Sequence, residues 1–128
     1  MQWSEVIESP YLNDLPFKIE LNRYGKIEMT PASNKHARLQ SFIATLLERK
    51  LKKGEALTEC SIQTTEGVKV ADVAWCSKVF IQQYSYETPY SCAPEVCVDV
   101  VSPSNSKKEM EDKVQLYLQA GAQEVWVV

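Results

Sequence analysis

The sequence predicts an α/β protein, specifically an α+β arrangement in which helices flank a mixed sheet and an N-terminal β-hairpin comes first. Apolar residues recur at helical spacing in two separate segments. Valine-rich and alternating runs, typical of strands, lie between and after these segments. The predicted order is hairpin, α, β, β, β, α, β. At 128 residues, the chain is expected to form one domain over 1–128.

The N-terminal half is expected to hold an arm, the hairpin and the first helix. Residues 1–16 contain two prolines and are expected to be irregular. Residues 17–21 and 26–29 alternate apolar and polar side chains around a turn, which indicates a hairpin. A helix start signal precedes the apolar stripe of residues 34–52, and Gly54 ends that helix.

The C-terminal half is expected to supply the sheet and the second helix. Residues 77–93 carry several tyrosines and are predicted to be part short helix and part loop. A cap at 102–106 begins a helix that stops at Gly121. Strands are predicted over 58–64, 68–76, 95–101 and 125–128.

Composition and charge exclude several classes of protein. With 45% hydrophobic and 24% charged residues, the chain is neither a disordered tail nor a fibre nor a coiled coil. No apolar run reaches the length of a membrane span, and the first residues do not form a secretory signal, so we expect no membrane partner. The net charge of −3 excludes a generally basic nucleic-acid coat, although a local basic patch stays compatible with it.

The cysteines predict a reduced, cytoplasmic protein. The four cysteines form no CxxC pair, and the chain has a single histidine, which does not fit a zinc site. We therefore expect them to be small core residues: Cys60, Cys76, Cys92 and Cys97.

Two aspartates interrupt strands that should otherwise be apolar. Asp72 lies within the run VKVADVAW, and Asp99 lies within VCVDVV. A carboxylate in a central strand is unfavourable unless it is paired, protonated or bound to a metal. Two such carboxylates on adjacent strands would form a site of hard oxygen ligands for Mg²⁺ or Mn²⁺.

Lys113 is expected to reach this pair. Asp99 lies roughly 10 Å before the turn that follows its strand. Lys113 lies roughly 12 Å back along the returning helix, on its inward face. A carboxylate pair with a lysine can bind a metal and orient a phosphodiester for attack by water. The alternatives are a strand-end Asp72, a hydrogen-bonded Asp99 and a Lys113 that extends to solvent.

Further residues are accessory candidates. His36 and Gln40 lie one turn apart on the first helix and could face the site, although a lone histidine more often packs or caps. Glu20 and Glu28 on the hairpin could supply a third carboxylate, with a solvated position as the alternative. Two lysines at the start of the second helix, Lys107 and Lys108, are candidates for contacts with phosphate groups.

The chain resembles the Uma-two family of PD-(D/E)XK nuclease-like proteins over almost all of its length beyond residue 16. The most specific match is Ser102-Pro103-Ser104-Asn105, followed at the family's spacings by Lys113, Tyr117 and Ala120-Gly121. The other matching segments are Ile19–Asn22, Gly25–Pro31, His36 with Leu39-Gln40, Val70–Trp75, Ala93–Glu95, Val98–Val101 and Val125-Trp126.

The resemblance implies a restriction-endonuclease-like αβββαβ core whose two acids correspond to Asp72 and Asp99. Val101 stands where the usual lysine follows the second acid, and the family's helix lysine corresponds to Lys113. Three departures are visible: Ala71 replaces a proline, Asp99 replaces the usual glutamate, and the family usually continues beyond Val128. We therefore expect the C-terminal end to be truncated relative to the family.

Three functions stay open at this point. The first is a Mg²⁺- or Mn²⁺-dependent endonuclease that hydrolyses DNA, with a homodimer as an option. The second is a degenerate nuclease fold that acts as a nucleic-acid-binding or protein-interaction module. The third is a scaffold subunit whose sheet edge pairs with another copy of the chain.

Overall fold

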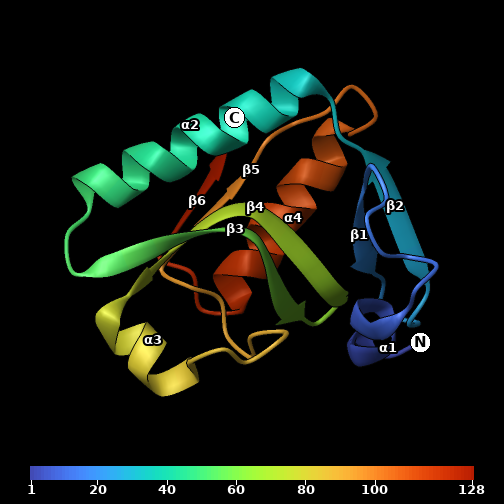
Figure 1. The fold of residues 1–128 in the computed structure, drawn as a ribbon, viewed down its shortest axis with the longest axis horizontal. Helices are drawn as coiled ribbons and strands as arrows, with labels where there is room; N and C mark the ends of the chain where they lie inside the picture. Colours follow the sequence, from blue (N-terminus) through green and yellow to red (C-terminus); the bar gives the residue numbers. More distant parts are fainter.

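The computed structural model describes all residues, 1–128, and consists of four helices and six strands (Figure 1). The helices are α1 (Trp3–Glu8), α2 (Asn34–Lys50), α3 (Lys78–Tyr84) and α4 (Lys107–Gln119). The strands are β1 (Phe17–Leu21), β2 (Ile27–Pro31), β3 (Gly54–Thr64), β4 (Gly67–Ser77), β5 (Val96–Asp99) and β6 (Glu124–Val127). The predicted order of elements is confirmed, with α3 inserted between β4 and β5.

The main sheet is mixed, as predicted. Its strand order is β3-β4-β5-β6, and β1-β2 form a separate antiparallel hairpin. The β3–β4 and β4–β5 pairs are antiparallel, whereas β5 and β6 are parallel. Parallel neighbours require a crossover, and α4 provides it.

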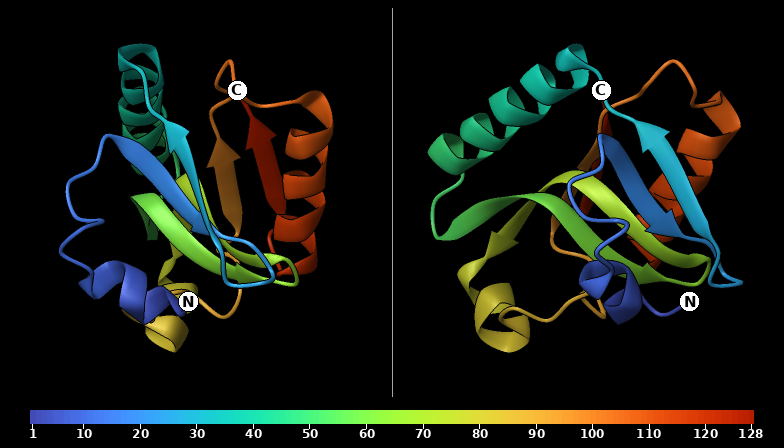
Figure 2. Two further views of the ribbon diagram at one scale, coloured as in Figure 1. Left: turned by 90° about the vertical axis from the view of Figure 1, so that its right-hand side faces the viewer. Right: turned by 45° about the vertical axis from the view of Figure 1, so that its right-hand side comes forward.

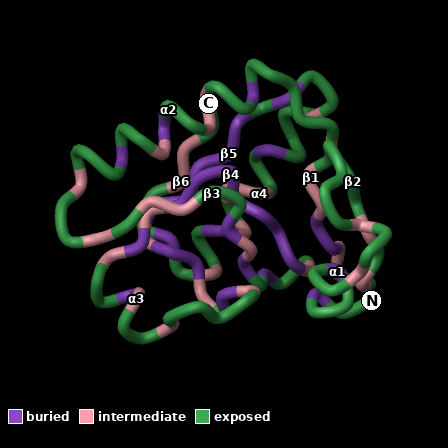
Figure 3. Tube along the Cα trace, in the orientation of Figure 1, coloured by how far each residue is buried: buried purple, intermediate pink, exposed green.

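The two long helices cover opposite faces of this sheet (Figure 2). On one face, Ile43 and Leu47 of α2 pack against Val73 and Val98. On the other face, Tyr117 of α4 belongs to a core cluster that includes three cysteines. The buried residues are therefore concentrated along β4 and β5, in the middle of the molecule (Figure 3). Cys60, Cys76 and Cys97 are buried free thiols, and Cys92 is half-buried and also free.

The N-terminal arm is more ordered than the sequence suggested. Residues 3–8 form helix α1, whose first turn is supported by a hydrogen bond from the Gln2 amide to Glu5 Oε1 (3.4 Å). Trp3 and Val6 are buried against the hairpin and the first half of β4. The prediction that residues 1–16 are irregular is wrong for this helix because tertiary burial stabilises a segment too short to be helical alone.

The strands β4 and β5 separate part-way along β4, and this split positions the site. β4 has 11 residues, but β5 pairs with only Val73, Ala74 and Trp75. The hairpin strand β1 packs over the half of β4 that does not pair with β5.

None of the helices has the length and apolarity that crossing a membrane requires.

Candidate active site where two strands separate

Asp72 and Asp99 lie opposite each other at the split. The last paired residues of the two strands are Val73 and Val98, so one further step of the same register places Asp72 across from Asp99. Val73 and Val98 face α2, and alternation therefore directs both aspartates to the α4 face. Both carboxylates are almost fully buried, at 2% and 1% exposure.

Carboxylates replace the missing ladder hydrogen bonds at this point. The Asp72 amide donates to Asp99 Oδ1 (3.2 Å), and the Val100 amide donates to Asp72 Oδ2 (2.7 Å). Further along β4, the Val70 amide donates to Glu20 Oε2 (2.7 Å). Buried backbone amides need partners, so the split itself favours acidic side chains here. It also explains why β5 ends at Asp99, short of the predicted strand 95–101.

Two lysines from different elements form ion pairs with the three carboxylates. Lys18 Nζ, from β1, lies 3.1 Å from Asp72 Oδ1 and 3.2 Å from Asp99 Oδ1. Lys113 Nζ, from α4, lies 2.8 Å from Glu20 Oε2 and 3.5 Å from Asp99 Oδ2. The sequence analysis expected Lys113 to lie level with Asp99 along the fold, and its ammonium lies beside Asp99 Oδ2. Lys18 alone contacts both aspartates.

These contacts shift the ionisation of the buried groups. Burial by itself would raise the pKa of Asp99, but Lys18, Lys113 and the Asp72 amide outweigh it and hold that pKa below its usual value. Burial by itself would lower the pKa of Lys18, but Asp99, Glu20 and Asp72 raise it above its usual value. Asp99 and Lys18 are therefore both charged at neutral pH.

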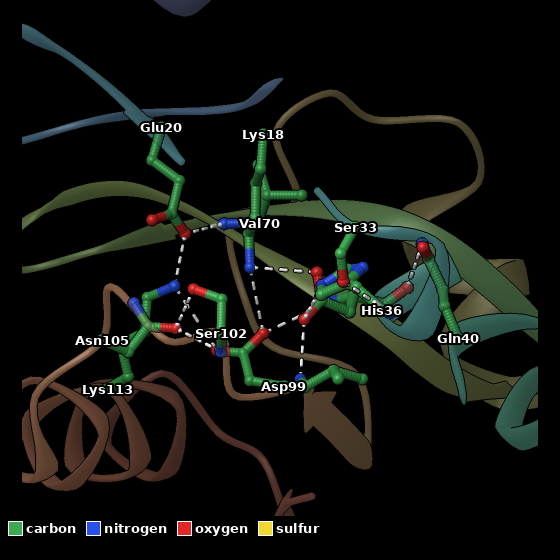
Figure 4. A network of polar contacts seen from close by, with 12 residues as sticks. Lys18, Glu20, Ser33, His36, Gln40, Val70, Asp99, Ser102, Asn105 and Lys113 are labelled. Atoms are coloured by element: carbon green, nitrogen blue, oxygen red, sulfur yellow. Dashed lines mark hydrogen bonds and ion pairs between the residues drawn. The ribbon is translucent and has the colours of Figure 1, made fainter. Parts of the chain in front are cut away.

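The start of α2 contributes His36 and Gln40. Ser33 caps the helix by accepting a hydrogen bond from the His36 amide (3.1 Å). His36 Nε2 lies 3.2 Å from Asp72 Oδ2, and Gln40 Nε2 donates to the Asp72 carbonyl (2.9 Å). Figure 4 shows Glu20 and Lys113 on one side of Asp99 and His36 and Gln40 on the other.

The loop before α4 is folded so that the helix returns over the aspartates. Asn105 Oδ1 accepts hydrogen bonds from the Ser102 amide (2.9 Å) and the Ser102 hydroxyl (3.0 Å). Ser106 then caps α4 by accepting from the Glu109 amide (3.1 Å). This turn, which the sequence singled out, fixes the helix that carries Lys113.

Three predicted residues lie outside this cluster. Glu28 is 55% exposed at its side chain and pairs with Lys69 (3.6 Å). Lys108 pairs with Asp112 one helical turn away, and neither Lys107 nor Lys108 forms an ion pair with the cluster.

Sequence reasoning missed Lys18. The signal that could have identified it is its spacing. Lys18 lies two residues before Glu20 on a strand, and such residues share one face.

Hollows border the cluster on two sides. A cleft of about 780 Å³ reaches Glu20 and Lys113, and another of about 500 Å³ reaches Lys18, His36 and Asp72. The larger cleft is mainly acidic, so it would repel a polyanion unless bound cations screened the repulsion. Its charged lining residues are Glu20, Glu28, Glu66, Lys69, Glu109, Asp112 and Lys113.

The donor set fits a divalent cation in chemical type. Asp72 Oδ1 and Asp99 Oδ1 already converge on one positive group, and buried Asp99 Oδ2 accepts no hydrogen bond. Mg²⁺ is commonly held by one or two carboxylates together with water and substrate phosphates. No three Asp, Glu, His or Cys side chains are arranged to hold a metal ion by themselves.

The comparisons agree with this fold. The chain aligns over 100% of its length with 73% of a crystal structure described as "a putative nuclease belonging to DUF820" from Anabaena variabilis, at a TM-score of 0.74 and 17% identity. The fold is restriction-endonuclease-like, with a mixed sheet and an N-terminal hairpin.

The family profile of Uma2 (Uma-two), described as "Putative restriction endonuclease", matches residues 3–128, and the chain belongs to this family. No curated protein shows a significant match.

Proposed function

We propose that this protein is a divalent-metal-dependent phosphodiesterase that cleaves DNA. The observation that carries the proposal is the pair of buried, directly opposed carboxylates, Asp72 and Asp99, whose Oδ1 atoms both face one cation position. Two lysines and a histidine from three elements gather around this pair beside two clefts, and such a group of titratable residues is typical of a functional site. The family and the similar crystal structure are both described as nucleases, which supports the same class of reaction.

Each residue then has a defined task. Asp72 and Asp99 would hold Mg²⁺ or Mn²⁺, which supplies a Lewis acid and lowers the pKa of a bound water. Lys113 lies beside Asp99 Oδ2 and lines the larger cleft, so it can stabilise charge that develops on a phosphate there. Glu20 holds Lys113 in place, and His36 and Gln40 hold Asp72.

The charge distribution limits how the substrate is held. A net charge of −3 and an acidic cleft offer little non-specific affinity for DNA. A homodimer would double the contacts with a duplex and match a two-fold site. Lys107 and Lys108, exposed at the start of α4, are the candidate phosphate contacts.

A degenerate nuclease fold that only binds nucleic acid or protein is the second candidate. Two observations favour it: the second acid is an aspartate, and Lys18 already forms ion pairs with both aspartates. In that case the cluster would be an internal ion network that stabilises the fold.

Metal titration with a cleavage assay distinguishes the two functions. We expect calorimetry to show about one Mn²⁺ bound per wild-type chain. Both this metal binding and the cleavage of duplex DNA should be lost in Asp72→Asn. The control is Asp112→Asn, which changes an exposed carboxylate that lines the larger cleft. Wild-type chain that binds no Mn²⁺, with or without duplex, would support the binding module.

A further inference from the structure

Lys18 occupies the position where a cation would bind. Its Nζ lies 3.1 Å from Asp72 Oδ1 and 3.2 Å from Asp99 Oδ1, and no other cation contacts both aspartates. Lys113 is nearest to Glu20, and His36 touches only Asp72. A side chain of the hairpin therefore compensates the charge of the aspartates, in addition to the lysine of α4.

An ammonium and a divalent cation cannot share these oxygens. Metal–oxygen bonds to Mg²⁺ are about 2.1 Å long and require direct contact with the carboxylate. Two positive charges within a few ångströms would also repel each other strongly in a buried environment. A metal that binds the Oδ1 atoms of Asp72 and Asp99 must consequently displace Lys18.

The structure leaves room for this displacement. Lys18 lines the hollow of about 500 Å³ that also reaches His36 and Asp72, and its side chain is 14% exposed. A lysine side chain has a flexible four-carbon stem, so its ammonium can move into that hollow while its backbone stays paired with Thr30.

We infer that Lys18 is a positioning residue that serves as the counter-cation of Asp72 and Asp99 until a divalent cation displaces it. The inference rests on the proposed metal dependence. It assigns the hairpin a role in metal loading: the metal-free site is held assembled and closed, and loading releases a positively charged side chain beside the site.

The first test uses the sign of a change in affinity. We expect Lys18→Met to bind Mn²⁺ at least about tenfold more tightly than the wild type, because a competing positive charge is removed. Lys69→Met is the matched control, since Lys69 is another largely buried lysine, paired with Glu28 instead, and it should change the affinity much less. A purely structural Lys18 would give the opposite sign, because its loss would disorder the aspartates and weaken binding.

The second test needs no variant and stays valid if Lys18→Met fails to fold. The wild-type chain is briefly acetylated with and without saturating Mn²⁺, and the modification of each lysine is measured by mass spectrometry. We expect Mn²⁺ to increase the labelling of Lys18 several-fold relative to Lys69. Unchanged labelling at a metal concentration that calorimetry shows to be saturating would overturn the inference.

The outcomes separate this inference from the proposed function. If the wild type binds Mn²⁺ through Asp72 but Lys18→Met binds it equally or more weakly, the displacement of Lys18 is refuted and metal dependence stands. If only Lys18→Met binds Mn²⁺, the metal does not displace Lys18 in the wild type, so the inference is refuted and the wild-type chain fits the binding module. If neither chain binds the metal, both ideas are refuted.

Discussion

At the scale of single residues, the protein is defined by charges buried as a group. Three carboxylates and two lysines lie together in this group: Glu20, Asp72, Asp99, Lys18 and Lys113. Each carboxylate also accepts a hydrogen bond from a backbone amide. Removing one member of such a group leaves an uncompensated buried charge and destabilises by about 3 to 5 kcal/mol. The cluster can therefore serve stability and function with the same side chains.

The ion pair between Lys113 and Glu20 gives a first prediction. Lys113→Met should lower the free energy of unfolding by about 3 kcal/mol, because Glu20 is 7% exposed and loses its cation. Lys108→Met removes an exposed lysine of the same helix and should change stability by less than about 0.5 kcal/mol. Urea unfolding followed by circular dichroism measures both. Equal effects would show that the cluster is not coupled to folding.

The ionisation of Asp99 gives a second prediction, for acid conditions. Its folded pKa lies below the ordinary 3.8, so its stabilising effect is complete above that pH and is lost as the pH falls through the lower folded value. The free energy of unfolding should accordingly fall below about pH 4. Asp99→Asn should show a shallower decrease over the same range. An equal loss of stability at low pH in the wild type and in Asp99→Asn would show that Asp99 does not cause it.

At the scale of elements, the site depends on how the hairpin sits on the sheet. The hairpin carries Lys18 and Glu20, and the turn between β3 and β4 packs directly against its end. Gly67, the first residue after that turn, has a φ of +94°, and a Cβ there would meet the Leu21 carbonyl oxygen and the Asn22 backbone. The position of the hairpin, and hence of both charged residues, is fixed by this close approach of two backbones.

A third prediction compares two glycines with positive φ. Gly67→Ala should destabilise by roughly 3 kcal/mol or more, because strain and a backbone clash add together. Gly121 has a φ of +118°, but a Cβ there would make only an ordinary contact, 3.9 Å from the Ala93 carbonyl oxygen. Gly121→Ala should therefore cost only strain, about 1 to 2 kcal/mol. The measurement is the thermal midpoint of each purified variant. A larger loss at Gly121 would argue against the hairpin contact.

At the scale of the whole molecule, charge decides how a nucleic acid could be held. The net charge is −3, and the larger cleft beside the site is acidic. Binding to a polyanion therefore depends on added cations and on local basic groups more than on the general surface.

A fourth prediction follows for DNA affinity. Fluorescence anisotropy with a labelled duplex should show little binding in the presence of a chelator and clear binding with Ca²⁺, a hard cation that takes the same kind of oxygen ligands as Mg²⁺. The double variant Lys107→Ala and Lys108→Ala should weaken the Ca²⁺-dependent binding and reduce its salt dependence if these lysines contact phosphates. Binding that is equally strong in chelator would contradict a metal-dependent site.

Much of the architecture followed from local patterns in the sequence. The apolar stripe of α2 and the cap of α4 are local signals that predict these helices without knowledge of their neighbours. A carboxylate within an apolar strand marks Asp72 and Asp99 as unusual because burial of a lone charge is unfavourable. Helix geometry was enough to relate Lys113 to Asp99, since the two lie on neighbouring elements joined by a short turn.

Tertiary structure decided what distant segments contribute. Lys18 and Asp99 are 81 positions apart, and no local pattern states that a hairpin lysine reaches a strand in the second half of the chain. The same packing selects Glu20 and leaves Glu28 exposed, and it makes a helix of residues 3–8. The sequence by itself determined the elements beyond residue 16 and the two aspartates through periodicity and the penalty for burying charge. Only the folded chain determined which cation neutralises these aspartates, because that depends on how the hairpin packs where β4 and β5 separate.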